Sequence, residues 1–300
     1  MTGLGKLTKR NLKMFFKDKG IFFTSLITPM ILLILYATFL ANVYRDSFES
    51  AIPDGLALKE TLLNGTVGGQ LFSSLLAVCC VTVAFCANML MVQDKVTGSR
   101  KDMLIAPVKK STLAISYYAA TLVSTLIICL VATAVSLIYV ANIGWYISVS
   151  DIVYILLDVF LLVMFGTALS SIINFFLTSQ GQISAVGTIV SAGYGFICGA
   201  YMPISQFGSG LQKVISFLPC TYGTSLLKNH ALRGVFEEMK NLGIPTEAIE
   251  EMKVVLDCNL FFNGNKVEIS TMYLILGLTV AGLLAVYILM NVFLTKPKKK

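Results

Sequence analysis

Charged residues are scarce in this 300-residue chain: Lys, Arg, Asp and Glu together make up 13% of it, whereas hydrophobic residues make up 56%. Soluble domains carry roughly 25% charged residues, so the chain has about half the usual share. Its apolar runs reach the roughly 20 residues that a helix needs to cross a bilayer. The low charge therefore excludes an ordinary soluble domain and predicts an all-α integral membrane protein, because backbone groups inside a bilayer must bond within their own helix.

Groups for catalytic and metal chemistry are also few. The sequence has a single histidine, His230, no Cys-x-x-Cys pair and no G-x-x-x-x-G-K-[ST] loop for nucleotide phosphates. We therefore expect neither a catalytic residue nor a metal site, and no cofactor bound by this chain. The net charge of +7 gathers in short segments beside apolar runs, which is typical of membrane flanks and does not predict a nucleic-acid partner.

Six apolar runs predict six transmembrane helices. They cover residues 21–43, 67–92, 113–140, 152–177, 183–202 and 272–294. The first run is longer than the roughly 7–15 apolar residues of a signal peptide, and no A-x-A site follows it. We therefore expect it to be a span and not a cleaved leader.

The distribution of Lys and Arg predicts the orientation. The segments before the first span, between spans two and three, between spans four and five, and after the sixth carry 15 basic residues in all, and the segments on the opposite side carry 8. Basic residues favour the cytoplasmic side. Both termini are therefore predicted to lie in the cytoplasm, as an even number of spans also requires.

Two segments outside the spans have a recognisable character. Residues 1–20 place Leu4, Leu7, Met14 and Phe15 on one helical face and lysines on the other, which predicts an interfacial helix on anionic membrane lipid. Residues 203–269 lie on the predicted external side. Prolines divide the first half of this segment into pieces of about 15 residues, too short to cross, which favours re-entrant or interfacial helices.

The second half of that external segment, residues 236–268, is polar and predicts a small cap, in which TEAIEEMKVVLDCNL is typical of an amphipathic helix. Cys220 and Cys258 both lie on this side, where a disulfide is conceivable, although reducing compartments would leave both as thiols. Asp158 is the one ionisable residue well inside a predicted span. It is either a substrate or proton site, or, as we favour, an acid that is paired near the external interface.

Small residues recur at helical spacing in two spans. Gly187, Ser191, Gly195 and Gly199 follow one another every fourth residue, and a second series contains Ser73, Ala77, Cys80, Ala84 and Ala87. Such faces let helices approach closely. They serve either packing within one subunit, or contact with a second copy, or a path that opens and closes.

The largest charged piece between spans on the predicted cytoplasmic side is QDKVTGSRKDMLIAPVKKS, residues 93–111. It resembles the coupling segment of type-2 ABC exporter permeases, which reads like E-R-E-x-G-T-x-E-x-L-x-x-T-P-x-x-R. The matching residues are Asp94, Lys95, Gly98, Ser99, Leu104, Ala106, Pro107 and Lys109 or Lys110. Ser116-Tyr117 stands near the place where the family has Gly-Lys, which is a departure from the pattern.

A second resemblance to the same family follows span five. The residues that match in order are Gly199, Pro203, Leu211, Gln212, Phe217, Pro219, Thr221, Tyr222 and Arg233. One proline that the family often has between Pro203 and Leu211 is absent. With the six-span layout and the basic helix before the first span, the resemblance covers essentially the whole chain, residues 1–300, as one permease domain.

The resemblance implies a mechanism. Two permease chains, identical or related, would each dock one ABC ATPase subunit, and that subunit would use ATP and Mg²⁺. Residues Arg100, Lys101 and Asp102 would orient the docked segment, Leu104 and Ile105 would anchor it, and Pro107 would end its helix. Residues Gly199, Pro203, Leu211, Phe217, Pro219 and Tyr222 would form an external gate. Spans one, two and five would border the path of a hydrophobic or amphipathic cargo across the cell membrane of a bacterium.

Two other classes of protein were weighed. One is an ATP-independent secondary transporter or channel, and the other is a membrane-embedded enzyme that acts on lipids. The lack of buried charge pairs and of inverted hydropathy halves argues against the first. The near absence of histidine and of paired acids inside the spans argues against the second.

Overall fold

The structure is a computed structural model, and it describes residues 3–35, 38, 41–42, 45–46, 59–106 and 108–294. Much of the second half of the predicted first span, Pro107 and the tail from residue 295, with its four predicted cytoplasmic lysines, lie outside the described residues. The described elements are α1 (Leu4–Lys17), α2 (Lys19–Leu35), α4 (Glu60–Ala87), α5 (Met89–Val96), α6 (Ser99–Ile105), α7 (Lys110–Ile143), α8 (Val149–Phe176), α9 (Gln180–Ile197), η2 (Ile204–Gln206), α10 (Ser209–Ser216), α11 (Pro219–Asn241), α12 (Thr246–Val255), β1 (Phe261–Phe262), β2 (Asn265–Lys266) and α13 (Ile269–Phe293).

Long apolar helices dominate the described chain, which confirms an all-α membrane protein. Four are long and apolar enough to span a bilayer: Glu60–Val96 (α4 with α5), α7, α8 and α13. The pair α1 and α2, bent by 72°, makes a fifth if it is counted as one span. Helix α9 has 18 residues but is rich in Gly, Ser, Thr and Gln, and it is not among these helices. The number six therefore stays a prediction.

Helix α4 lies at the centre of the bundle, and almost all of its side chains are buried. It packs against α2, α7, α8, α9 and α11. Small residues permit this: a Cβ on Gly166 of α8 would lie 2.8 Å from the Cys80 carbonyl oxygen. Ser73, Ala77 and Ala84 are all fully buried, so the predicted small-residue face of this helix packs within the chain.

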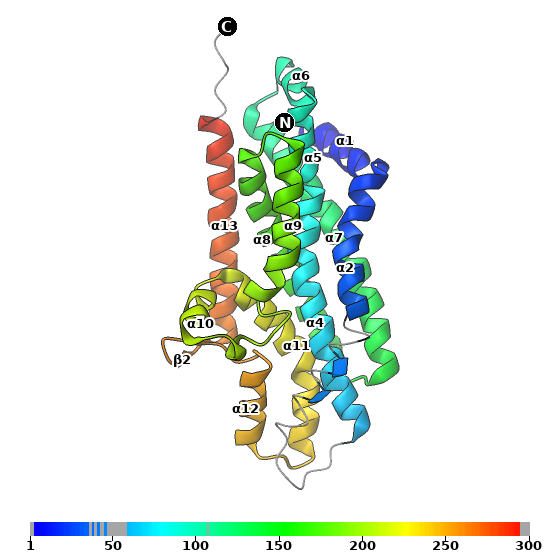
Figure 1. The fold of residues 1–300 in the computed structure, drawn as a ribbon, viewed down its shortest axis with the longest axis vertical. Helices are drawn as coiled ribbons and strands as arrows, with labels where there is room; N and C mark the ends of the chain where they lie inside the picture. Colours follow the sequence, from blue (N-terminus) through cyan, green and yellow to red (C-terminus); the bar gives the residue numbers. More distant parts are fainter. Residues whose placement is uncertain are drawn as a thin grey trace.

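The two ends of the molecule differ in what they carry. Figure 1 shows the N-terminus, α1, α6 and the end of α13 together at one end, and α12 at the other. The segment predicted to couple to an ATPase therefore shares its end with the interfacial helix. This is the arrangement that the charge distribution predicts, and it puts α6 where a partner outside the bilayer can reach it.

Helix α1 is amphipathic, and its buried face agrees with the predicted one at Leu4, Leu7 and Phe15 but not at Met14. Phe15 and Asn11 are buried, whereas Met14 is 41% exposed. Asp18 forms the corner, because its extended backbone ends α1 and its carboxylate accepts a hydrogen bond from the backbone N–H of Ile21 at 3.1 Å. That bond satisfies one of the donors that a helix start leaves free, so α2 begins at once in a new direction.

The external half differs from the prediction in one respect. The sequence predicts a division near residue 236 between the semi-apolar half and the cap. Helix α11 runs across this division without a break and has 23 residues. Phe236 and Met239 pack there with Ile249 and Met252 of α12, which confirms the predicted cap helix and explains why α11 is not interrupted. The start of α11 lies deeper, because its Gly223 packs against Leu162, midway along α8.

Candidate functional site: the coupling segment, the groove and the external helices

The coupling segment is a helical corner made of α5 and α6. Helix α5 continues α4 after Asn88, and α6 begins after Gly98. Gly98 has φ +86°, a left-handed conformation that glycine adopts without steric cost. The glycine of the motif is therefore explained by the turn that sets α6 at an angle to α5.

Asp94 faces inward from this corner. Its carboxylate forms an ion pair with the guanidinium of Arg10 on α1 and accepts a hydrogen bond from the Tyr117 hydroxyl of α7 at 2.6 Å. The second guanidinium nitrogen of Arg10 donates to Asp94 Oδ1 at 3.0 Å. Tyr117 belongs to the pair that departs from the family motif. Neither partner can be recognised from the sequence, because Arg10 lies 84 and Tyr117 23 residues away along the chain.

Lys95 faces the end of α8. Its ammonium group donates to the carbonyl oxygens of Asn174 at 2.8 Å, Phe175 at 2.6 Å and Leu177 at 3.2 Å. The last carbonyls of a helix have no partner within it and carry partial negative charge, so a lysine there both satisfies and stabilises them. Lys95 thus attaches the corner to α8.

The second helix of the corner is attached to α13 and exposes its tip. Arg100 donates to Asn291 Oδ1 of α13 at 3.2 Å. Leu104 is half-buried against the core formed around Tyr117 and Tyr287, whereas Ile105 is 84% exposed. Of the two predicted anchor residues, only Ile105 is presented to a partner. Lys101 and Asp102 are exposed as well.

A groove of about 1150 Å³ lies between α2 and α9. Its floor includes Cys86, Met89 and Gln93 of α4 and α5. The three elements around it are those expected to border the path, namely spans one, two and five. Gly187 and Ser191 of α9 are among the lining residues.

Gly195, the third of the small residues predicted on α9, is buried beside the groove. A Cβ on it would lie 2.3 Å from the ring of Tyr201, whose hydroxyl donates to the Ser191 carbonyl oxygen at 3.3 Å. The repeated small residues of α9 therefore let the chain fold back on the helix as well as line the groove.

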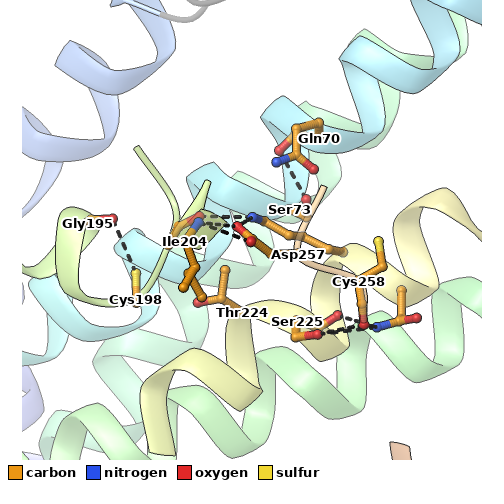
Figure 2. Close-up of polar contacts among 12 residues, drawn as sticks. Gln70, Ser73, Gly195, Cys198, Ile204, Thr224, Ser225, Asp257 and Cys258 are labelled. Carbon is orange, nitrogen blue, oxygen red and sulfur yellow. Dashed lines mark hydrogen bonds and ion pairs between the residues drawn. The ribbon is translucent and has the colours of Figure 1, made fainter. Parts of the chain in front are cut away.

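The chain leaves α9 at Gly199, where a buried polar cluster holds the external helices together (Figure 2). Lys228 of α11 is 0% exposed, and its ammonium group donates to the Gly199 carbonyl oxygen at 2.9 Å and to Asp257 Oδ2 at 3.0 Å. Both oxygens of Asp257 also accept from the backbone N–H of Ile204, at 3.0 and 3.2 Å. One ion pair thus ties α11 to the end of α9, to η2 and to the turn after α12.

The predicted gate residues are distributed over this region. Gly199 has φ +74°, Pro203 precedes η2 and Pro219 is the first residue of α11. Tyr222 is buried and its hydroxyl donates to the Ser216 carbonyl oxygen at 2.5 Å.

The other two gate residues belong to an apolar face of α10. Leu211 is 48% and Phe217 is 67% exposed. Phe217 also meets Phe262 of β1 edge to face, with ring centroids 4.9 Å apart.

Asp158 is fully buried and paired. His230 Nδ1 of α11 lies 2.6 Å from its Oδ2, and the Tyr273 hydroxyl of α13 donates to its Oδ1 at 2.6 Å. One turn further along α11, Arg233 Nε lies 2.7 Å from Asp151 Oδ1 of α8. Together with the buried Lys228–Asp257 ion pair, these contacts show that the expectation of no buried charge pairs is wrong. They join α11 to elements that sequence spacing does not place beside it.

The two cysteines on the external side are free and buried, and no disulfide joins Cys220 to Cys258. Burial raises the pKa of the Cys258 thiol to about 12, so little thiolate exists at pH 8. We expect alkylation of Cys258 by iodoacetamide at pH 8 to be at least about tenfold slower in the folded protein than in denaturant. Peptide mass spectrometry measures this. Equal rates in the two states would contradict the buried placement.

The fold and these sites define a multi-pass membrane protein with a helical corner at one end, a largely apolar groove along its side and short helices toward the other end. The family comparison agrees with this class. A family model described as ABC-2 type transporter matches residues 2–230, and the chain belongs to this family as a transporter permease component. The family is one of non-catalytic transport subunits that associate with an ABC ATPase. A search of curated proteins gives no match.

Proposed function

We propose that this chain, as a single permease domain over residues 1–300, forms the membrane path of an ATP-driven exporter. Two permease chains pair, as a homodimer or a related heterodimer, and each docks one ATPase subunit that binds ATP and Mg²⁺. Both termini lie in the cytoplasm of a bacterial cell. The cargo is hydrophobic or amphipathic and leaves from the cytoplasm or the inner leaflet.

The observation that carries this proposal is the attachment of the α5–α6 corner. Asp94, Lys95 and Arg100 connect it to α1, α7, α8 and α13, while Ile105 stays exposed. A force on the tip of α6 therefore reaches four helices through direct polar contacts. It also reaches α4, which continues into α5 and forms part of the floor of the groove. A plain solvated loop needs none of these attachments.

Co-purification of the ATPase subunit tests the proposal. We expect Ile105→Ser to reduce retention of the ATPase by at least about tenfold, because an exposed apolar residue at the centre of an interface often contributes 1–2 kcal/mol or more. Val149→Ser is the matched control, since Val149 is 80% exposed at the opposite end of the bundle. If wild type retains no ATP-hydrolysing subunit, or if both variants retain it equally, the coupling role of α6 is wrong.

The alternative function is an ATP-independent secondary transporter. The observation in its favour is the buried Asp158–His230 pair, since ionisable groups inside spans often mark proton routes. Transport by the purified chain in vesicles without any ATPase would support it. Transport that requires both the ATPase and ATP supports the exporter.

A further inference from the structure

The groove between α2 and α9 has two chemically different walls. On α2 its lining is mostly aliphatic, with Ile27, Ile31 and Leu35, and Thr24 adds one hydroxyl group. On α9 a polar stripe runs along the same groove at helical spacing: Gln180, Ser184, Thr188 and Ser191. A molecule in the groove therefore meets hydrocarbon on one side and hydroxyl and amide groups on the other.

Three hydroxyl groups of the groove already donate their hydrogens to backbone carbonyls. Thr188 donates to the Ser184 carbonyl oxygen at 3.0 Å, and Ser184 donates to the Gln180 carbonyl oxygen at 3.3 Å. On the opposite wall Thr24 donates to the Gly20 carbonyl oxygen at 2.7 Å. Each of these three hydroxyl oxygens keeps lone pairs and can accept a hydrogen bond from a molecule in the groove. The side-chain amides of Gln93, Gln180 and Gln206, which also line the groove, can both donate and accept.

The only charge among the described lining residues of the groove is negative. Among the described lining residues Asp18 is the single charged one, and none is Lys, Arg or His. This is unexpected for a chain with a net charge of +7. Lys17 and Lys19, the neighbours of Asp18, are exposed and do not line the groove. An acidic ligand would therefore find no cation to pair with there.

From these observations we infer the substrate class, an inference that rests on the proposed export function: the cargo is an amphiphile with a protonated amine or another donor-rich polar group. Its apolar body lies along α2 and its donors face the acceptors of α9. The volume of about 1150 Å³ is above the usual 300–1,000 Å³ of ligand pockets, which gives room for a long hydrocarbon or a multi-ring body. Amphiphiles with anionic head groups are disfavoured.

Transport of two matched probes tests the inference in the complete permease–ATPase complex reconstituted in vesicles. The probes are a fluorescent long-chain alkylamine and the alkyl sulfonate of the same chain length. We expect ATP-dependent transport of the amine to be at least about tenfold faster, which corresponds to about 1.4 kcal/mol. Equal rates, or faster transport of the sulfonate, would overturn the inference while leaving the export function intact.

A double variant tests whether the polar stripe of α9 causes the preference for the amine over the sulfonate. Ser184→Ala combined with Thr188→Val removes two acceptors, and we expect it to lower the amine-to-sulfonate ratio at least threefold. The control is Thr279→Val on α13, where the hydroxyl bonds to its own helix in the same way but lies outside the lining. An unchanged ratio in the double variant would count against the stripe.

A photoreactive alkylamine gives a readout that does not require transport. Illumination of the wild-type complex is expected to label residues of α9 between 180 and 191, as mapped by mass spectrometry. Labelling confined to other helices would contradict the site. If the wild type labels on α9 but neither probe is transported with ATP, the binding inference stands and the export function fails.

Discussion

Asp94→Asn is expected to destabilise the protein by about 2 kcal/mol and to abolish most cargo-stimulated ATPase activity. Breaking a buried ion pair from one side typically costs about 3–5 kcal/mol, because the remaining charge stays desolvated. The cost is lower here because the side chain of Arg10 is 32% exposed, although that of Asp94 is only 5% exposed. Without the Asp94 carboxylate, α1 and α7 lose their polar contacts to the α5–α6 corner, so movement of α6 no longer reaches them. Thermal unfolding in detergent and ATPase assays of the complex measure the two effects.

Asp102→Asn is the matched control, since Asp102 lies in the same segment and is exposed. It should change the free energy of unfolding by no more than about 0.5 kcal/mol. A stability of Asp94→Asn equal to that of the control would show that the Arg10–Asp94–Tyr117 contacts do not hold the corner. Normal stability together with lost stimulation would instead place Asp94 at the ATPase surface.

Lys228→Met should have the largest effect on stability, about 3–5 kcal/mol, because it leaves Asp257 buried without its cation. Lys228 is 0% exposed. The loosened external helices should unfold first, which limited proteolysis of the cap detects. Lys240→Met, at an exposed position of the same helix, should leave stability nearly unchanged.

The defect of Lys228→Met should depend on pH. Burial raises the pKa of Asp257, and the Lys228 ammonium and the Ile204 N–H oppose that rise. A carboxyl whose folded pKa is raised stabilises the fold when protonated, and this contribution is lost as pH rises through the folded pKa. The deficit should therefore be largest at neutral pH and should shrink as the pH falls toward about 4, the ordinary value for Asp.

The double variant Lys228→Met with Asp257→Asn distinguishes charge burial from packing. Removing both charges should restore most of the lost stability, because replacing a buried pair is often nearly neutral. A double variant as unstable as the single one, with no pH dependence in either, would show that the lysine acts through packing alone.

Much of the fold follows from local features of the sequence. The long apolar runs predict α4, α7, α8 and α13, because a charge-free run in a bilayer must form a helix wherever it lies. The extended backbone at Pro203, the start of α11 at Pro219 and the turn at Gly98 also follow from single residues with restricted or unusual backbone freedom. The helical face of α1 is less well predicted, since Asn11 is buried and Met14 is exposed through contacts that α1 makes with other helices.

The sequence by itself determined that this chain is a helical membrane protein, where most of its spans lie, and that residues 93–111 form a charged segment between them. Only the tertiary structure decided that Asp94 and Lys95 face inward, that Ile105 is presented outside, and that Lys228 and Asp257 meet. These contacts join residues 23 to 84 positions apart along the chain. Hydropathy and helix periodicity report which face of a segment avoids water, and they carry no information on which other segment covers that face.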